Sequence, residues 1–296
     1  MNILVVYYSQ SGQLKEIADS LVRPLEKHNL TWHRIEPVQD YPFPWDGDTF
    51  FGSFPDAFGL KPQALKPIPQ EILQRKFDLI LFHYQVWFLS PSIPITSFLK
   101  SEEGKKLLGS APVITISGTR NMWLKAQEKV KRLLKDAGAT LVGNIALVDR
   151  AGNLVSVVTI VDWLFSGIKR RYLGIFPLPG VSQTDIAGAA RFGRIIGEHL
   201  ESGTLGSLQP ALVQAGAVEI SSYLLSVDQK GNKIFSKWAA IIEKNPGKRK
   251  FLLKLFNIYI VLALYVVSPI VFVFHYLTYP IWRKSFLREK AYYQSV

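Results

Sequence analysis

The chain opens with the sequence ILVVYY (residues 3–8), which runs directly into SQSGQL (9–14) and then into KEIADSL (15–21). A short apolar run that ends at turn residues is typical of a strand buried on both faces of a parallel sheet. The hydroxyl-rich loop would then lie at the N-terminus of a helix, where free backbone N–H groups and the helix dipole favour a phosphate. This stretch predicts a strand, a phosphate-binding loop and a helix, and with them a phosphorylated cofactor.

The loop at 9–14 lacks two common nucleotide-binding patterns. It has no Gly-x-x-x-x-Gly-Lys-Ser/Thr, whose lysine contacts the β- and γ-phosphates of a triphosphate, and no Gly-x-Gly-x-x-Gly for a dinucleotide. It offers Ser9, Ser11 and Gly12 without a basic side chain, which suits a single phosphomonoester, the group that FMN carries. The alternative is an ordinary strand followed by a serine-capped helix, because serine is a preferred N-cap residue.

Two later segments repeat the pattern of a buried strand followed by a loop. Residues 77–84 and 112–116 predict strands, the loops after them contain Trp87 and Trp123, and a helix is expected over 124–137. In an open parallel sheet, loops at the carboxyl ends of the strands converge on the ligand. The two tryptophans have flat faces that can stack on an isoalloxazine ring, or they simply pack the loops. The three loops together favour FMN.

With these loops the chain resembles the flavodoxin-like family, and more closely its NAD(P)H-dependent, quinone-reductase-type FMN oxidoreductases. The resemblance covers residues 1 to about 200 and implies an α/β fold with a doubly wound, five-stranded parallel sheet. It implies that the first loop holds the FMN phosphate and that the next two hold the flavin ring. The cofactor-binding residues expected are Ser9, Gln10, Ser11, Gly12, Gln13, Leu14, Val86, Trp87, Phe88, Leu89, Ser117, Gly118, Thr119, Arg120, Asn121 and Trp123.

Three residues near these loops are candidates for catalysis. His83 is a candidate general acid or base, and Tyr84 beside it is a candidate proton donor. Arg120 in the third loop could neutralise reduced flavin or an anionic substrate. The alternatives are a structural histidine and a surface arginine. No pattern of histidines, cysteines or carboxylates suggests a metal site.

Composition excludes several classes of protein. There is no cysteine among the 296 residues, so disulfides, iron–sulfur clusters and thiolate catalysis are excluded, and redox chemistry needs an organic cofactor. The net charge is +12, and residues 248–296 hold eight of the basic residues against one acidic residue. These charges flank a hydrophobic stretch instead of forming one basic face, which argues against nucleic-acid binding. The chain enters a core strand at once, which argues against a cleaved secretory signal.

We divide the chain into a flavodoxin-like domain (1–202), a connecting segment (203–250) and a membrane anchor with a basic tail (251–296). The domain is expected to contain an insertion at about 151–182, whose apolar residues and basic triplet suit a lipid surface or a wall for a hydrophobic substrate. Residues 40–69 are too broken by proline and glycine for regular structure, and they form a lid or cover a sheet edge.

Smaller predictions complete the domain. Further strands are expected over 31–36 and 139–148, and a closing helix over 185–200. No internal repeat is visible.

Residues 255–282 contain no Asp, Glu, Lys or Arg over 28 positions. About 20 apolar residues are enough to cross a bilayer, and tyrosines, Trp282 and basic clusters bracket the stretch as interface anchors. Pro269 would kink a spanning helix or make the turn of a re-entrant one. A buried core helix would need protein around its whole circumference. We therefore expect attachment to a lipid bilayer, with the domain on the cytoplasmic face.

These features together predict a membrane-associated FMN oxidoreductase that acts on a hydrophobic cyclic substrate. The tail and the insertion further resemble the flavodoxin-like aromatase of bacterial dialkylresorcinol and flexirubin pathways. That resemblance implies oxidation of a dialkyl cyclohexane-dione to a dialkylresorcinol and a ketosynthase as partner enzyme. The alternatives are a membrane-tethered, flavodoxin-type electron carrier, a quinone reductase that uses NADH or NADPH, and an adaptor that has lost the cofactor. Quinone-reductase relatives often form homo-oligomers.

Overall fold

A computed structural model describes residues 1–296 and has a five-stranded parallel sheet at its centre. The sheet order is β2-β1-β3-β6-β7. The strands are β1 (Asn2–Tyr7), β2 (Asn29–Arg34), β3 (Leu79–Tyr84), β6 (Val113–Thr119) and β7 (Leu141–Val148). All four neighbouring pairs are parallel, as in Val5 opposite Leu81. This confirms the predicted doubly wound, five-stranded sheet.

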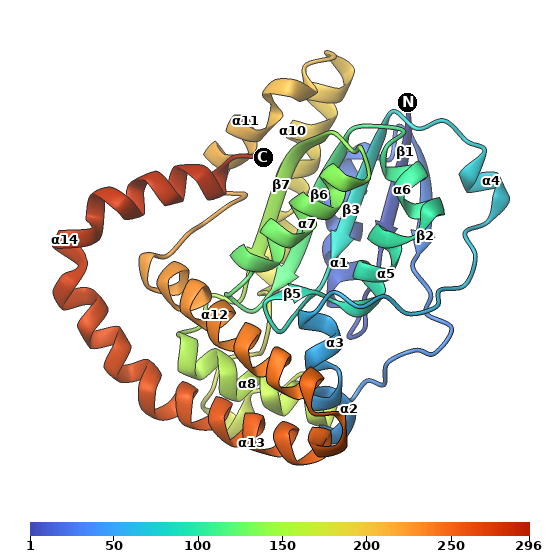
Figure 1. Cartoon of the computed structure of the whole chain (residues 1–296). Helices are drawn as coiled ribbons and strands as arrows, with labels where there is room; N and C mark the ends of the chain where they lie inside the picture. The colour runs from blue at the N-terminus through green and yellow to red at the C-terminus, as the bar shows by residue number, and fades with distance from the viewer.

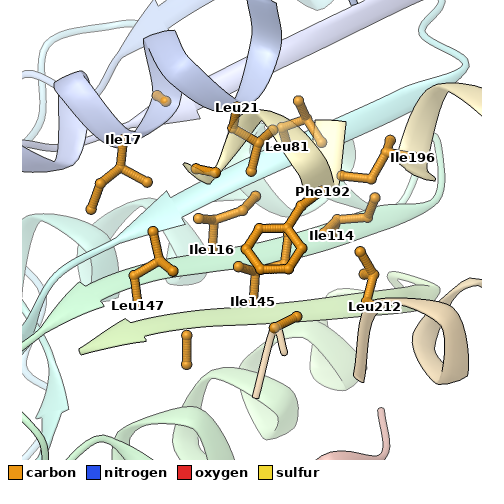
Figure 2. Close-up of a cluster of buried hydrophobic side chains, with 14 of the residues drawn as sticks. Ile17, Leu21, Leu81, Ile114, Ile116, Ile145, Leu147, Phe192, Ile196 and Leu212 are labelled. Atoms are coloured by element: carbon orange, nitrogen blue, oxygen red, sulfur yellow. The ribbon is translucent and has the colours of Figure 1, made fainter. Parts of the chain in front are cut away.

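Helices cover both faces of the sheet (Figure 1). One face carries α1 (Gln13–Val22) and α10 (Ala190–Glu201), and the other carries α5 (Ile93–Lys100), α6 (Glu102–Leu108) and α7 (Leu124–Asp136). Figure 2 shows Phe192 of α10 packed over the strands on the first face. Alternate residues of β1 enter different cores, Ile3 and Val5 on the α1 side and Leu4 and Val6 on the α7 side. This two-residue period is what a strand between two helical layers requires.

Two local predictions, for the end of β6 and for the closing helix, are wrong in detail. β6 runs on to Thr119, so Ser117 and Gly118 pair with β7 instead of forming a loop. The closing helix is split into α9 (Gln183–Gly188) and α10, and a glycine, which weakens a helix, ends the first piece.

Residues 40–69 also hold more regular structure than predicted. They contain α2 (Gly47–Gly52) and α3 (Phe54–Phe58). The Asp46 carboxylate accepts a hydrogen bond from the Thr49 N–H at 2.8 Å and caps α2, and proline occupies the first turn of α3. Both are typical helix-start devices. The apolar aromatic residues here therefore form helices that pack on the loops below them.

The remaining elements lie around the sheet. The insertion forms α8 (Asn153–Ser166) near the carboxyl ends of the strands, and the connecting segment contains α11 (Leu208–Gln214) and the long α12 (Ser222–Lys244). Leu208 and Leu212 of α11 belong to the same core as β7. Short elements complete the list: α4 (Gln70–Leu73), α9, and a two-stranded hairpin of β4 (Val86–Trp87) and β5 (Ser90–Pro91).

The C-terminal residues form a long curved helix that we call the C-terminal arc. It consists of α13 (Arg249–Leu262), a π-helical segment (Ala263–Val267) and α14 (Ser268–Gln294). Figure 1 shows it in orange and red, curving around α12 with its outer side away from the sheet. By length and composition, the helix Pro246–Gln294 is apolar enough to cross a membrane.

Candidate functional site

The loop between β1 and α1 leaves backbone N–H groups free at the start of a helix. Gly12 precedes α1 in the left-handed conformation (φ 86°), which glycine adopts at little cost. The amide groups of Lys15 and Glu16 donate to the Gly12 carbonyl, but those of Ser11, Gly12, Gln13 and Leu14 have no hydrogen-bond partner in the protein. The Lys15 ammonium pairs with Asp19, and residues 9–14 themselves carry no basic side chain. Four free N–H groups at a helix N-terminus favour an anion.

Several side chains of this loop bind neighbouring segments or pack in the core. The Gln13 side chain accepts a hydrogen bond from the Val181 N–H at 3.0 Å and donates to the Val181 carbonyl at 3.1 Å. Gln10 donates to the Pro42 carbonyl at 2.6 Å, and Leu14 lies in the core. These three predicted cofactor residues therefore contribute backbone groups or hold neighbouring segments. Ser9 and Ser11 supply the remaining hydroxyls.

The second predicted loop is a hairpin turn in a strained conformation. Phe88 and Leu89, between β4 and β5, have φ values of 48° and 59°. Two left-handed residues suit a two-residue hairpin, but asparagine and glycine normally occupy those positions. The left-handed region costs a bulky residue roughly 1–2 kcal/mol. Packing offsets this cost, because the Phe88 ring contacts the rings of Phe50 and Phe54 at centroid distances of 4.9 and 5.4 Å.

Trp87 lies under an aromatic cover. Its ring is 4.8 Å from that of Tyr41, 5.2 Å from Trp45 and 6.2 Å from Tyr8. Trp45 is buried, and its backbone N–H donates to the Leu164 carbonyl of α8 at 2.8 Å. Residues 40–58 and the insertion therefore meet over the second loop, which places the predicted lid segment at the carboxyl end of the sheet.

Three of the buried polar atoms without partners lie near the carboxyl ends of β3 and β6. They are the Gln85 Oε1 just after β3, the Ser117 Oγ within β6 and the Asn121 Oδ1 just after β6. Buried polar groups are nearly always hydrogen-bonded, so unpaired ones at a loop cluster indicate a ligand position. Sequence reasoning named Ser117 and Asn121 but missed Gln85, although Gln85 directly follows the end of β3, where a ligand residue is expected.

Trp123 and Gly118 have packing roles in this structure. The Trp123 side chain is 2% exposed and belongs to the large core beneath α1, so its faces are not free to stack on a ring. A Cβ atom on Gly118 would approach the Ile17 Cδ1 atom to 2.6 Å. A side chain at this position would therefore require the Ile17 side chain of α1 to move. The Thr119 carbonyl accepts a hydrogen bond from the Asp149 N–H at 3.0 Å.

The two candidate catalytic residues of β3 point in opposite directions. His83 lies on the α1 side of the sheet, fully buried, with its Nδ1 atom 3.3 Å from the Leu81 carbonyl. Burial lowers the pKa of His83 to about 4, so its imidazole is neutral at neutral pH. Tyr84 lies on the α7 side, donates to the Gln127 Oε1 at 2.7 Å, and has a pKa raised by burial. Neighbouring strand residues cannot share one face, so these two side chains do not converge.

Arg120, the third candidate, lies in the loop after β6. Its Nη1 atom donates to the carbonyl and the Oδ1 of Asn153 at 3.2 and 3.0 Å. Burial lowers the pKa of the Arg120 guanidinium to about 10, which leaves it charged at neutral pH. It therefore holds the start of α8 and keeps a positive charge beside the third loop.

Two charged residues that sequence reasoning missed hold the site together. Asp149, the first residue after β7, is buried and accepts hydrogen bonds from the Ala151 N–H (2.9 Å), the Ser156 Oγ (2.8 Å) and the Gly180 N–H (3.3 Å). Its position at the end of a strand was a usable signal.

Lys129 of α7 fixes the hairpin from below. Its Nζ donates to the Ser90 Oγ at 2.6 Å and lies 3.7 Å from the centroid of the Phe58 ring. Burial lowers the pKa of Lys129 to about 8. In the sequence it is one of several lysines on an amphipathic helix, so no pattern distinguished it.

A hollow of about 150 Å³ lies away from these loops, between β2 and α5. His33, Glu36, Gln63 and Ser97 are among its lining residues. The chemistry described above is instead at the carboxyl ends of β1, β3 and β6, so this hollow is not part of the candidate site.

The strand order identifies the fold of this chain, for which sequence comparison finds no relative. No protein-family profile and no curated protein match the chain. The strand order is that of flavodoxin. The fold is flavodoxin-like.

Several solved structures resemble part of this flavodoxin-like chain. A flavoprotein in complex with FMN from Lactobacillus acidophilus is 19% identical, covers 49% of this chain and 92% of its own, and has a TM-score of 0.38. A flavodoxin from the domain Archaea is 12% identical, with coverage of 68% and 99% and a TM-score of 0.37. The Trp repressor binding protein of Bacillus subtilis is 12% identical, with coverage of 57% and 100% and a TM-score of 0.31. With TM-scores this low, strand order decides the fold.

Proposed function

We propose that this protein binds FMN and acts as an oxidoreductase on a hydrophobic ring substrate. The observation that carries the proposal is the set of four unpartnered amides from Ser11 to Leu14 at the start of α1, beside two serines and with no basic side chain among residues 9–14. Hydrogen bonds and the helix dipole can hold a phosphomonoester there. When bound, FMN would supply the hydride transfer, and the protein would supply orientation and electrostatics.

The polar atoms after β3 and β6 suit the other end of FMN. Gln85 and Asn121 each carry an amide, which offers both donors and an acceptor, and one oxygen of each is buried without a partner. The pyrimidine edge of a flavin has the same mixture of donors and acceptors. These two residues would hold that edge, and the charged Arg120 would favour the anionic reduced form.

The aromatic cover favours an enzyme over an electron carrier. Tyr41 and Trp45 lie against Trp87 and form an apolar wall over the second loop. Such a wall binds an apolar ring and excludes water from hydride transfer, whereas a carrier needs an exposed flavin edge for its partner. The narrower candidate, from the resemblance stated above, is oxidation of a dialkyl cyclohexane-dione to a dialkylresorcinol, with a ketosynthase as partner. A quinone reductase that uses NADH or NADPH is the runner-up.

FMN binding can be tested with a matched pair of glycine variants. Gly12 and Gly138 both have positive φ values, 86° and 70°, and open space where a Cβ would be. Gly12→Ala turns the loop amides away from the phosphate and is expected to weaken FMN binding at least about tenfold, or about 1.4 kcal/mol. Gly138→Ala, at the far end of α7, should leave binding unchanged. Fluorescence titration of the cofactor-free protein measures both.

Two results would overturn the proposal. Purified protein without flavin absorbance that takes up no added FMN would show that the loop does not bind it. Equal weakening by Gly12→Ala and Gly138→Ala would show that the loop is not the site. Turnover of a dialkyl cyclohexane-dione supports the enzyme. Electron transfer to a one-electron acceptor without turnover of any ring substrate would instead identify a carrier.

A further inference from the structure

The middle of the C-terminal arc is largely apolar and mostly exposed. Tyr265, Val266 and Val267 are 45%, 54% and 50% exposed, and Phe272, Val273 and Phe274 are 46%, 56% and 63% exposed. Three successive helical residues point about 100° apart and together take in most of the circumference. A helix with apolar residues on most of its circumference needs an apolar surrounding, and here the protein covers only the side that faces α12.

The N-terminal end of the arc is fastened to the flavodoxin-like domain. The Arg249 Nη2 donates to the Asp56 Oδ2 at 3.0 Å and to the Gly52 carbonyl at 2.9 Å. Phe256 is fully buried, and its ring stacks on that of Phe54 at 3.9 Å with an angle of 12° between the planes. This end therefore lies against the helices that cover the candidate site.

The C-terminal end of the arc returns to the same domain. Tyr293 is 7% exposed and packs in the core of the sheet. The Lys125 Nζ donates to the Tyr293 hydroxyl at 2.8 Å, and the Gln209 Nε2 donates to the Gln294 carbonyl at 2.8 Å. Figure 1 shows the C-terminus beside α11, close to the sheet.

The bend between the two ends has identifiable causes. The π-helical segment Ala263–Val267 is followed at once by Pro269 in the first turn of α14, and Pro280 lies further along. π-segments and proline are the usual reasons for a bent helix. At the bend, the Tyr223 hydroxyl of α12 lies 2.6 Å from the Ser268 Oγ. The bend is therefore part of the fold, since α12 holds it.

The charges at the two ends of the arc have the same sign. Lys248, Lys250 and Lys254 precede the apolar middle, beside Arg249, which pairs with Asp56, and Arg283, Lys284, Arg288 and Lys290 follow it. The one acidic residue, Glu289, accepts a hydrogen bond from Gln229. Cations at both ends complement the head groups of anionic lipids.

We infer that the C-terminal arc is a membrane-binding element that enters and leaves one leaflet from the same side, without crossing the bilayer. A crossing helix would separate its ends by a hydrocarbon core of about 30 Å, whereas both ends contact one folded domain. The apolar middle lies among acyl chains and the basic ends lie at head groups. This inference concerns the lipid surface alone and does not depend on FMN binding.

Topology can be tested by labelling, because the chain has no cysteine and each introduced thiol is unique. Ser202→Cys marks the domain, Lys244→Cys lies before the arc and Ser295→Cys lies after it, all at exposed positions. Full-length variants in sealed membrane vesicles are treated with a membrane-impermeant maleimide. We expect all three thiols to react from the same side. Reaction of Ser295→Cys only from the side opposite to Ser202→Cys would overturn the inference.

Lipid binding can be tested by flotation of the full-length protein with vesicles of equimolar phosphatidylcholine and phosphatidylglycerol. Leu277→Asp, in the apolar middle (72% exposed), should lose co-flotation. Ile241→Asp, at an exposed apolar position of α12 outside the arc (45% exposed), should keep it. Circular dichroism verifies that both variants fold. Equal flotation of the two variants would overturn the inference. A wild-type protein that remains in solution as a dimer and does not float with the vesicles would also overturn it.

Discussion

β3 and α14 are both rich in apolar residues, yet their surroundings are opposite. All six residues of β3 are buried, whereas only Ser268 and Tyr293 are buried among the 27 residues of α14. β3 lies between two helical layers and two strands, while α14 contacts the protein through α12 and its own C-terminal end. Apolar composition therefore identifies a segment that avoids water, and tertiary contacts decide whether protein or another apolar medium surrounds it.

The largest expected effect is a difference in stability when the same substitution, Phe→Ala, is made in the sheet core and in the arc. Phe192→Ala removes a fully buried ring from the sheet core and should lower the free energy of unfolding by about 3–5 kcal/mol. Phe274→Ala removes a ring that is 63% exposed in the arc and should change it by no more than about 0.5 kcal/mol. Urea unfolding of both variants in one non-ionic detergent measures the difference. Equal losses would contradict the comparison.

The second prediction concerns the joint between the regions. Asp228 of α12 is fully buried and accepts a hydrogen bond from the Leu124 N–H at 2.8 Å, capping α7. Burial raises the pKa of this carboxyl to about 6 from 3.8. The folded state therefore binds the proton more tightly than the unfolded state does. The protonated carboxyl contributes to the free energy of unfolding in full below pH 4, and this contribution is lost as the pH rises through 6.

The size and sign of this effect can be measured against Asp228→Asn, which does not titrate. Relative to that variant, the unfolding free energy of the wild type should fall between pH 4 and pH 6 by up to about 3 kcal/mol. Urea unfolding at several pH values gives the difference. A wild type that gains stability over this range would show that the carboxyl is charged and well paired in the fold.

The third prediction sharpens the comparison inside the sheet domain. Gly12→Ala and Gly138→Ala each place a side chain in the left-handed region, where neither meets an atom within 4 Å. Each should lower the unfolding free energy by about 1–2 kcal/mol. The two losses should match in thermal unfolding without FMN. A much larger loss for Gly12→Ala would mean that the conformation of this loop also stabilises the rest of the fold.

The smallest effect concerns the returning end of the arc. Tyr293→Phe keeps the ring in the core but removes the hydroxyl that accepts from Lys125, which should cost about 1 kcal/mol. Tyr276→Phe, at a tyrosine in the apolar middle that is 52% exposed, should cost almost nothing. Chemical denaturation of both gives the comparison. If neither substitution changes the free energy of unfolding, the end of the arc is not held by this hydrogen bond.

Local patterns were sufficient for the sheet and the first loop. The apolar runs of β1 and β3 and the glycine before α1 depend on neighbours in sequence, so they could be predicted. Gln85 and Asp149 had only their position after a strand as a signal, and Lys129 had none, because the role of all three depends on which loops converge. The prediction that Trp123 stacks on a flavin is wrong for the same reason, since a flat ring packs equally well in a core.

The sequence by itself determined a doubly wound sheet, a glycine-containing loop at Ser9 to Leu14 before a helix and an apolar stretch at 255–282, because strand period, turn residues and hydropathy are local properties. Only the tertiary structure decided that His83 and Tyr84 face opposite sides, that aromatic residues cover Trp87, and that the arc returns to the domain through Tyr293. These outcomes depend on contacts between residues far apart in the chain, which no local pattern encodes.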